Sequence, residues 1–399
     1  MFVSYLRYSL LLVAACPFIY YLIAIVCSGR FFWGVPAGKS PAVADGKSFL
    51  PPVSILKPNR GLDPDAYENF ASFCRQNYPD YEIIFCIDDP AEPVVAVLDQ
   101  LRRNFPDTQI RVLYGSGRNA VNDKVAKLAR LVAEARHEVV VINDSDVRVD
   151  PDYLRTIVAP LADKKVGAVT CFYVPILETG IIDYIQEIGM ASDFYAGILV
   201  AKYLDGVKFA LGPTIATTRT HLSGFGGYEA IENRPADDML VGRLIAEQGF
   251  EVVLLPYAID TVADYRSLGD LFLKRLRWMV VMRNLRPAGH LGLIFTQGLP
   301  WSIAAIAICP TATVAGAYLG AYVFLRVLMT WVIGIRGLNQ PSLWKKLPLI
   351  PVWDAMALAI WLLSFTRNTI RWRNAEYFIR NGELVPASGV RLEGVPETK

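Results

Sequence analysis

Two carboxylates follow the most apolar short run of the central sequence at a spacing that could hold a metal ion. Asp144 and Asp146 stand one residue apart, directly after VVVIN. Two such carboxylates can converge on one divalent cation when the chain turns, and their hard oxygen atoms suit Mg²⁺ or Mn²⁺. A solvated turn is the simpler interpretation, but unpaired charge beside a buried strand is costly. The pattern therefore favours a metal site at these two residues.

Two more acidic pairs could bind a ligand or move a proton. Asp88 and Asp89 end the apolar run IIFCI and precede a proline, which on its own is typical of a turn. Asp237 and Asp238 follow the glycine-containing turn 224–227 and begin a helical pattern. Acids at a helix start ordinarily cap the helix or face its dipole. Each pair keeps both a structural and a functional interpretation.

Basic residues at two places could bind phosphate. Lys274, Arg277 and Trp278 belong to the block KRLRW, just ahead of an apolar stretch. The block could anchor at the lipid headgroups, but guanidinium groups also bind phosphate with two parallel hydrogen bonds. Asn122 and Lys124 open an expected helix, and a helix N-terminus with a lysine is a suitable anion site.

The elements that would position these residues alternate between short β-branched runs and amphipathic stretches. Apolar residues at helical spacing predict helices over 121–135 and 237–248. The alternation predicts an α/β fold with a mostly parallel sheet covered on both faces, in which ligands lie at the carboxyl ends of strands. The expected strands are Val53–Leu56, Glu82–Ile87, Ile110–Leu113, Glu138–Ile142, Gly167–Phe172 and Glu251–Leu255.

The two ends of the chain are apolar enough to enter a membrane. Residues 8–27 carry no charge, and about 20 such residues cross a hydrocarbon core. This run exceeds the ~7 to 15 apolar residues of a cleaved signal peptide, so we expect a retained anchor. Residues 299–332 predict a hairpin of two spans with a break near Cys309 and Pro310, and residues 347–365 predict a third C-terminal span.

These features predict an anchor over residues 1–28, a cytoplasmic domain over 50–290, a C-terminal transmembrane region over 295–366 and a tail over 367–399. Basic residues at the borders of the central domain place it in the cytoplasm by the positive-inside rule. With three C-terminal spans the same rule conflicts with the basic tail, so the side of the tail stays open. The border residues are Arg30, Lys39, Lys47, Lys274, Arg275, Arg277, Arg283 and Arg286.

Composition narrows the class of protein. Of the 399 residues 53% are hydrophobic and 20% charged, which excludes a disordered chain and argues against a purely water-soluble one. The 40 Lys and Arg balance 38 Asp and Glu, so no broad basic surface for nucleic acid is expected. Cys74, Cys86 and Cys171 lack metal-site or disulfide spacing and are expected to be reduced thiols.

The order of the acidic and basic segments resembles the D, D, D, (Q/R)xxRW pattern of membrane glycosyltransferases with the GT-A fold. The ceramide glucosyltransferase family is the most similar, and bacterial hopanoid glycosyltransferases resemble the chain in the same segments. The likeness covers most of the chain. It includes ILKPNRGLDPDAYENFASFCRQNYP, Asn122-Asp-Lys124, DSDVRV, ADDMLVGRLIAEQGF and RWRNAEY.

The resemblance implies a role for each acid. Asp89 matches the first acid, which contacts the nucleotide. Asp144 matches the second, in the DxD region that holds the metal and diphosphate, with Asp146 as the other carboxylate. Asp238 matches the third acid, the catalytic base, while Lys124 would help to neutralise the diphosphate.

Two positions depart from the family pattern. Lys274 stands at the first position of (Q/R)xxRW and keeps a cation without the planar fork of arginine, whereas Arg277 and Trp278 match. Residues 191–194 replace a His-Pro of the animal members. This second departure weakens the expectation that ceramide itself is the acceptor.

Together these features predict a membrane enzyme that moves a sugar, expected to be glucose, from a UDP-sugar to a lipid hydroxyl by inverting single displacement. Ceramide is the first acceptor candidate, and a hopanoid N-acetylglucosaminyltransferase is the close alternative. The apolar segment 181–204 could lie in the membrane interface or form a core helix. A processive polysaccharide synthase would need more spans. A non-enzymatic lipid-binding protein would be expected to lack the acids.

Overall fold

The computed structural model describes residues 2–34, 49–176, 180–262, 265, 267–372 and 375–387. The chain packs into two compact units, each assembled from separate parts of the sequence. The helical unit comprises Met1–Pro36, Leu177–Gly206 and Tyr265–Ile370, and the sheet unit comprises Ala37–Ile176, Val207–Asp264 and Arg371–Lys399. The expected extent of a cytoplasmic domain, residues 50–290, stays a prediction. Lys39 and Lys47, used above for its orientation, lie outside the described residues.

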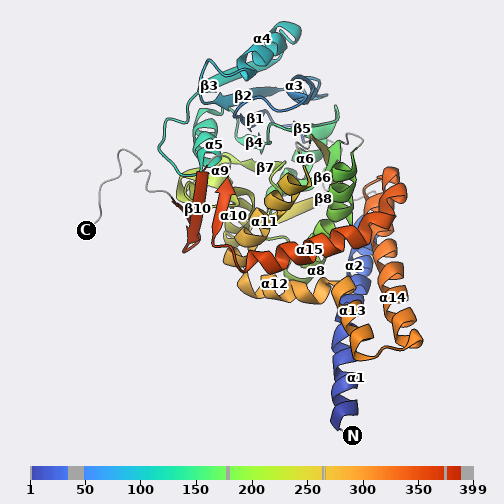
Figure 1. Cartoon of the computed structure of the whole chain (residues 1–399). Coiled ribbons are helices and arrows are strands. Elements are labelled where there is room, and N and C mark those ends of the chain that lie inside the picture. Colours follow the sequence, from blue (N-terminus) through green and yellow to red (C-terminus); the bar gives the residue numbers. More distant parts are fainter. Residues whose placement is uncertain are drawn as a thin grey trace. The chain divides into compact units, whose positions relative to one another are not determined.

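Within the described residues, eight strands form the sheet of the sheet unit in the order β3-β2-β1-β4-β7-β6-β8-β5 (Figure 1). β3, β2, β1 and β4 are parallel, as are β6 and β8. β7 is antiparallel to β4 and β6, and β5 is antiparallel to β8. The strands are β1 (Val53–Pro58), β2 (Tyr81–Ile87), β3 (Gln109–Tyr114), β4 (Val139–Ile142), β5 (Val147–Arg148), β6 (Val166–Ile176), β7 (Ile215–Thr218) and β8 (Glu251–Val262).

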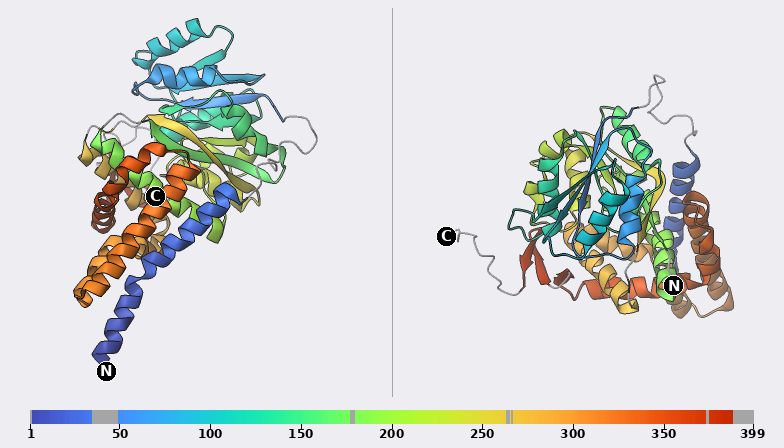
Figure 2. Two further views of the ribbon diagram at one scale, coloured as in Figure 1. Left: turned by 90° about the vertical axis from the view of Figure 1, so that its right-hand side faces the viewer. Right: turned by 90° about the horizontal axis from the view of Figure 1, so that it is seen from above.

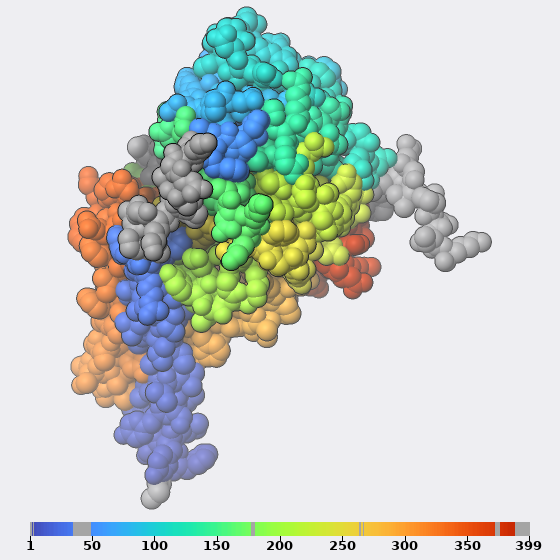
Figure 3. Space-filling model, turned by 180° about the vertical axis from the view of Figure 1, so that it is seen from behind, coloured from blue at the N-terminus to red at the C-terminus, as the bar shows by residue number. Residues whose placement is uncertain are grey.

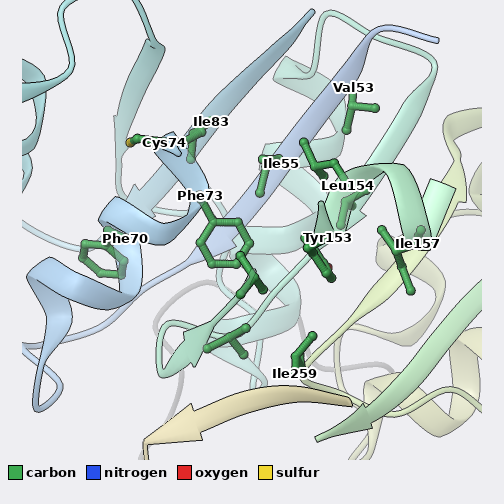
Figure 4. Packing of buried hydrophobic residues seen from close by; sticks show 14 of the residues in the cluster. Val53, Ile55, Phe70, Phe73, Cys74, Ile83, Tyr153, Leu154, Ile157 and Ile259 are labelled. Atoms are coloured by element: carbon green, nitrogen blue, oxygen red, sulfur yellow. The ribbon is translucent and has the colours of Figure 1, made fainter. Parts of the chain in front are cut away.

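Each face of the sheet carries its own hydrophobic core, because successive side chains of a strand point to opposite faces. On one face, Val53 and Ile55 pack with Phe73 of α3 (Ala66–Cys74) and with α6 (Tyr153–Val158), as Figure 4 shows. A second group of three short strands, β9 (Thr369–Trp372), β10 (Ala375–Arg380) and β11 (Glu383–Pro386), follows the last long helix.

The opposite face is covered by the two helices expected from the sequence. Leu56 of β1 packs with Leu128 of α5 (Asp123–Glu134) and Ile245 of α10 (Asp237–Glu247). α4 (Val94–Asn104) lies between β2 and β3 in the chain. The predicted α/β architecture is therefore confirmed, with all six expected strands present. β5 and β7 were not expected, because one has two residues and the other, IATT, is half polar.

The helical unit contains the apolar ends of the chain. Among the described residues, three stretches are long and apolar enough to cross a membrane, namely Ser4–Trp33, Ala312–Gly337 and Pro341–Ser364. They include α1 (Phe2–Ala14) with α2 (Cys16–Trp33), α14 (Ala312–Thr330) and α15 (Ile350–Ser364). Figure 2 shows α1 and α2 as a nearly continuous rod alongside α14.

The expected hairpin in 299–332 breaks where predicted, because α13 (Gly298–Ile308) ends just before Cys309. α13 has only 11 residues, too few to cross a bilayer alone. It forms a pair, bent by 59°, with the helical segment Pro287–Thr296, which is either a broken span or a re-entrant loop. Apolar side chains of α1 such as Phe2 and Leu12 are highly exposed, and α1 is the blue projecting end in Figure 3.

Charged residues inside these apolar helices pair with one another. Arg326 of α14 and Asp354 of α15 are both buried and form an ion pair. The hydroxyl of Tyr322 donates to Asp354 Oδ2 at 2.8 Å, and Arg326 also donates to the carbonyl oxygen of Ser192. Intramembrane charges are expensive unless paired, and they commonly mark functional regions.

Candidate functional site

The turn after β4 holds Asp144 in a fixed position through its neighbour Asn143. Asn143 is fully buried, and its Nδ2 donates to Tyr153 Oη, to the carbonyl of Pro213 and to Thr214 Oγ1, each at 2.9 Å. These bonds tie the carboxyl end of β4 to the turn that precedes β7. Asp144 therefore emerges at the junction of the parallel and antiparallel strands.

Lys124 joins Asp144 to the start of α10. Its Nζ lies 2.7 Å from Asp144 Oδ1 and 3.4 Å from Asp237 Oδ2. Asn122 caps α5, accepting from Val125 N at 3.4 Å, and donates to the carbonyl of Arg234 at 2.9 Å. The helix start predicted to bind an anion therefore lies beside both acidic segments.

Two of the predicted carboxylates lie close to Gly212. A Cβ atom on Gly212 would lie 3.0 Å from Asp238 Oδ2 and 3.6 Å from Asp144 Oδ2. A larger residue would therefore crowd both carboxylates. The structure thus brings Asp144 and Asp238 close to the same glycine, while their roles in metal binding and as the base stay predictions.

The backbone immediately before α10 is strained. Ala236, the N-cap, has φ 56° and ψ 57°, in the left-handed region. This conformation costs a residue with a side chain about 1–2 kcal/mol, and such strain tends to occur at functional sites. The strained turn fixes the direction in which Asp237 and Asp238 leave the chain.

The charges of the site shift the pKa values of its groups. Burial, followed by the charge of the neighbouring Asp237, raises the pKa of Asp238 to about 6, against the opposing effect of Lys124. Burial alone would lower the pKa of Lys124, but Asp144 and Asp237 outweigh it and raise that pKa well above its ordinary value. Lys124 therefore stays charged, and Asp238 ionises near neutral pH.

The carboxylate oxygens of Asp144 and Asp146 would supply part of the ligand set that a divalent cation needs. The charges of Asp146 and Asp144 both raise the pKa of the buried Lys57, against the larger lowering effect of burial. Their hard oxygen atoms suit Mg²⁺ or Mn²⁺, which commonly take one or two carboxylates plus phosphate and water. Across the described ranges, no group of three or more His, Cys, Asp and Glu side chains is placed to hold a metal.

Asp89 lies in the loop after β2, in the same unit. Its Oδ1 accepts from Ala91 N at 2.7 Å, which is the turn interaction considered from the sequence. Its neighbour Asp88 instead forms an ion pair with the buried Lys127, with Oδ1 2.5 Å from Nζ. The nucleotide-binding role of Asp89 stays a prediction.

Lys274, Arg277 and Trp278 lie on α11 (Leu268–Leu285) of the helical unit. The Lys274 ammonium lies 4.8 Å from the ring centroid of Tyr265, and the Trp278 ring lies 6.0 Å from that of Phe194. These three residues thus belong to a different compact unit from Asp144 and Asp238. Their part in donor binding stays a prediction.

Sequence reasoning missed three residues that shape the site. Asn143 and Gly212 organise the turns around the carboxylates, and Lys57 lies buried behind Asp144. An asparagine and a glycine in expected turns carry no distinctive signal. The sequence VSILKP places Lys57 directly after the apolar run Ile55–Leu56 and before a proline, and a lysine in a buried strand could have singled it out.

The chain resembles known glycosyltransferases in sequence and in structure. Ceramide glucosyltransferase 1 of Caenorhabditis elegans is 22% identical over 98% of this chain and 84% of its own length. Ceramide glucosyltransferase of Komagataella phaffii is 33% identical over 24% of this chain and 19% of its own length. The mannosyltransferase PcManGT from Pyrobaculum calidifontis, solved in complex with GDP-Man and Mn²⁺, aligns with a TM-score of 0.58 at 18% identity, covering 88% of this chain and 99% of that chain.

The structural match shows the GT-A fold predicted from the sequence. The family resemblance is confirmed independently, because the model of glycosyl transferase family 21 matches residues 9–385. A match over nearly the whole chain, together with the relatives named above, assigns a nucleotide-sugar-dependent hexosyltransferase. The chain belongs to glycosyl transferase family 21.

Proposed function

We propose that this protein transfers glucose from UDP-glucose to the primary hydroxyl of ceramide, with inversion at the sugar carbon. The observation that carries the proposal is that Asp144 and Asp238 both lie close to Gly212. Asp144 would act on the diphosphate of the donor, and Asp238 would act on the acceptor hydroxyl. The ceramide glucosyltransferase relatives support both the donor and the acceptor.

Asp238 is the general base of the proposed reaction. It takes the proton of the acceptor hydroxyl while the hydroxyl oxygen forms a bond to C1 of glucose. The bond from C1 to the diphosphate breaks, and UDP leaves with the electron pair. A carboxylate whose pKa burial raises to about 6 is suited to this task, because a base works best with a pKa near the working pH. The sequence motifs assign one base and no carboxylate nucleophile, so we expect a single displacement.

Positive charge must balance the leaving diphosphate. Lys124, held between Asp144 and Asp237, provides one fixed ammonium in the sheet unit. Arg277, Trp278 and Lys274 would contribute from α11, with arginine binding phosphate through two N–H groups. Asp89 would contact the nucleotide.

Asp144 and Asp146 would hold Mn²⁺ or Mg²⁺ together with the diphosphate. The bound cation would supply Lewis-acid stabilisation of the charge that develops on the leaving oxygen. PcManGT was solved with Mn²⁺ and a nucleotide sugar, which supports a metal role in the shared fold.

We infer that the acceptor is a lipid, because the described residues include long apolar helices and the curated relatives are ceramide glucosyltransferases. The three stretches able to cross a membrane characterise a membrane protein, and we infer that the sheet unit faces the cytoplasm, where UDP-sugars are available. A hopanoid is the second acceptor candidate, because residues 191–194 read ASDF where the animal family members carry His-Pro.

The proposal is tested with purified full-length protein in lipid nanodiscs. UDP-glucose, UDP-galactose and UDP-N-acetylglucosamine are each offered with ceramide and with a hopanoid polyol, and products are identified by mass spectrometry. We expect glucosylceramide from UDP-glucose, with the β-anomer determined by NMR. Transfer of N-acetylglucosamine to the hopanoid alone would replace this proposal by the alternative. Retention of the α-configuration would contradict the single displacement.

A further inference from the structure

Arg275 is a buried arginine that the proposed chemistry leaves without a role. It lies on α11, only 7% of its surface is exposed, and its Nε and Nη2 have no hydrogen-bond partner. A buried charged donor without an acceptor is costly, and native proteins rarely keep one without a ligand or an ordered water. The free N–H groups therefore indicate a ligand oxygen at this place.

Two tryptophan rings lie near the guanidinium group of Arg275. Its carbon lies 4.6 Å from the ring centroid of Trp278 and 5.4 Å from that of Trp353. Arginine stacks on aromatic faces while its N–H groups stay available in the plane of the fork. The two rings therefore fix the orientation of Arg275.

The surroundings of Arg275 favour a neutral, lipid-borne ligand. Trp353 belongs to α15, within the stretch Pro341–Ser364 that can cross a membrane. Asp193 interacts electrostatically with Arg275 and with the Arg326–Asp354 pair. The negative charge of Asp193 disfavours a second anion such as phosphate beside Arg275, whereas its carboxylate can accept a hydrogen bond from a hydroxyl or an amide N–H.

The helix that carries Asp193 also departs from regular geometry. Met190–Phe194 forms a single π-helical segment between α7 (Ile181–Gly189) and α8 (Tyr195–Asp205). Such insertions are frequent at functional sites. This segment falls within the apolar region 181–204, which the sequence left open as an interface element or a core helix.

We propose that Arg275 donates hydrogen bonds to a carbonyl oxygen in the headgroup of the lipid acceptor, beside the rings of Trp278 and Trp353. Asp193 accepts from the donor group next to that carbonyl. The inference rests on the proposed lipid glucosyltransferase function and specifies its acceptor as an amide-bearing lipid. Arg275 is then a residue that determines acceptor specificity, separate from the general base.

The test compares two acceptors that differ in the carbonyl. Short-chain ceramide carries hydroxyls and an amide carbonyl, whereas an alkylglycerol carries hydroxyls and no carbonyl. The kcat/KM for each is measured at saturating UDP-glucose in the wild type and in Arg275→Met. We expect the variant to lose about tenfold to a hundredfold on ceramide, the usual effect of one hydrogen bond from a charged donor. Its activity on alkylglycerol and its KM for UDP-glucose should change little.

Arg286→Met, at the C-terminal end of the same helix, is the matched control. Its side chain is 43% exposed, and its guanidinium lies 4.0 Å from Asp205. The kcat/KM values of this variant for ceramide and for alkylglycerol should therefore both match those of the wild type. If Arg275→Met does not fold, Arg275→Lys provides the second measurement. Lysine keeps the charge but cannot form the stacked fork, so the preference for ceramide should still fall.

The outcomes separate this inference from the proposed function. A folded Arg275 variant with an unchanged preference for ceramide overturns the inference, and so does a raised KM for UDP-glucose with equal losses on both acceptors. A wild-type protein that glycosylates hopanoid but not ceramide overturns the amide contact and the proposed acceptor together. If the wild type glucosylates ceramide, and both Arg275→Lys and Arg275→Met keep the wild-type preference for ceramide, the proposed function still holds. Only the role of Arg275 in acceptor specificity is then refuted.

Discussion

The Nζ of Lys57 donates a hydrogen bond to the backbone carbonyl oxygen of Asp144 at 3.1 Å, from a side chain that is fully buried. The ammonium also lies 3.6 Å from the ring centroid of Phe73. Burial is the largest influence on its pKa, which falls to about 7 despite the raising effects of Asp146 and Asp144. A strand residue on the core side thus supports the turn that carries the two predicted metal ligands.

Replacing Lys57 by methionine should show whether this residue supports catalysis through the Asp144 turn or only stabilises the fold. Methionine fills a similar volume, and removing the buried charge relieves its desolvation cost, which offsets the loss of one hydrogen bond, so the melting temperature should change little. The Asp144 turn loses its donor, and kcat/KM should fall by about tenfold, the value of one hydrogen bond from a charged group. Lys165→Met, at an exposed position, is the control. Unchanged kinetics in a folded Lys57→Met protein would refute the supporting role.

Asp238→Asn should separate binding from chemistry. The substitution keeps the size of the side chain and removes the proton acceptor, so turnover should fall by about 10² to 10⁴-fold. UDP-glucose affinity should change little, because Asp144 and Lys124 remain. Asparagine is also well tolerated at helix starts, so a purely structural Asp238 predicts normal turnover. More than about a tenth of wild-type turnover in a folded variant would shift the assignment to Asp237.

The pH profile should show the ionisation of Asp238. The base works only when deprotonated, so its active fraction decreases as the pH falls through its pKa. Burial, followed by the charge of Asp237, raises that pKa to about 6. The kcat/KM, which reports groups of the free enzyme, should therefore fall about tenfold per pH unit below pH 6. A profile flat down to about pH 4.5, near the ordinary carboxyl range, would contradict a raised pKa in the functioning enzyme.

Divalent cations should be required for activity. Asp146→Ala removes one of the two hard-oxygen ligands, so UDP-glucose binding in the presence of Mn²⁺ should weaken by about tenfold or more. Excess EDTA should abolish transfer by the wild type, and added Mn²⁺ or Mg²⁺ should restore it. Full activity in EDTA would disprove the metal assignment, whereas Asp152→Ala, at an exposed site, should behave like the wild type.

The apolar stretches should resist extraction without detergent. Ser4–Trp33, Ala312–Gly337 and Pro341–Ser364 each exceed the length needed to span a bilayer. The protein should therefore stay in the membrane pellet after washes with high salt and with alkaline carbonate, detected by immunoblot. Release into the supernatant would contradict both the anchor and the C-terminal spans.

The sequence predicted the parallel strands because each is a short β-branched run bounded by turn residues. It also predicted that Asp144 and Asp238 belong to one site, through the order of motifs. It could not place Gly212 or Asn143, since their roles depend on contacts with turns far along the chain. β7 was missed because its partners β4 and β6, rather than its own composition, make IATT a strand.

The resemblance also could not show that the motifs divide between two compact units. Asp144 and Asp238 lie in the sheet unit, while Arg277 and Trp278 lie on α11 of the helical unit. The domains predicted from the sequence are continuous segments, whereas helices from separate segments pack together through their apolar faces. α7 contacts α15, and α8 contacts α2, so residues 181–205 pack with the chain ends.

The insertion of residues 177–206 between β6 and β7 limits how this enzyme can be cut down for expression. Removing both apolar ends would still leave α7 and α8 in the middle of the remaining chain, without the α15 and α2 surfaces that cover them. Large uncovered apolar patches promote aggregation. A soluble version therefore cannot be obtained by trimming the termini, and would need the loop between β6 and β7 to be rebuilt.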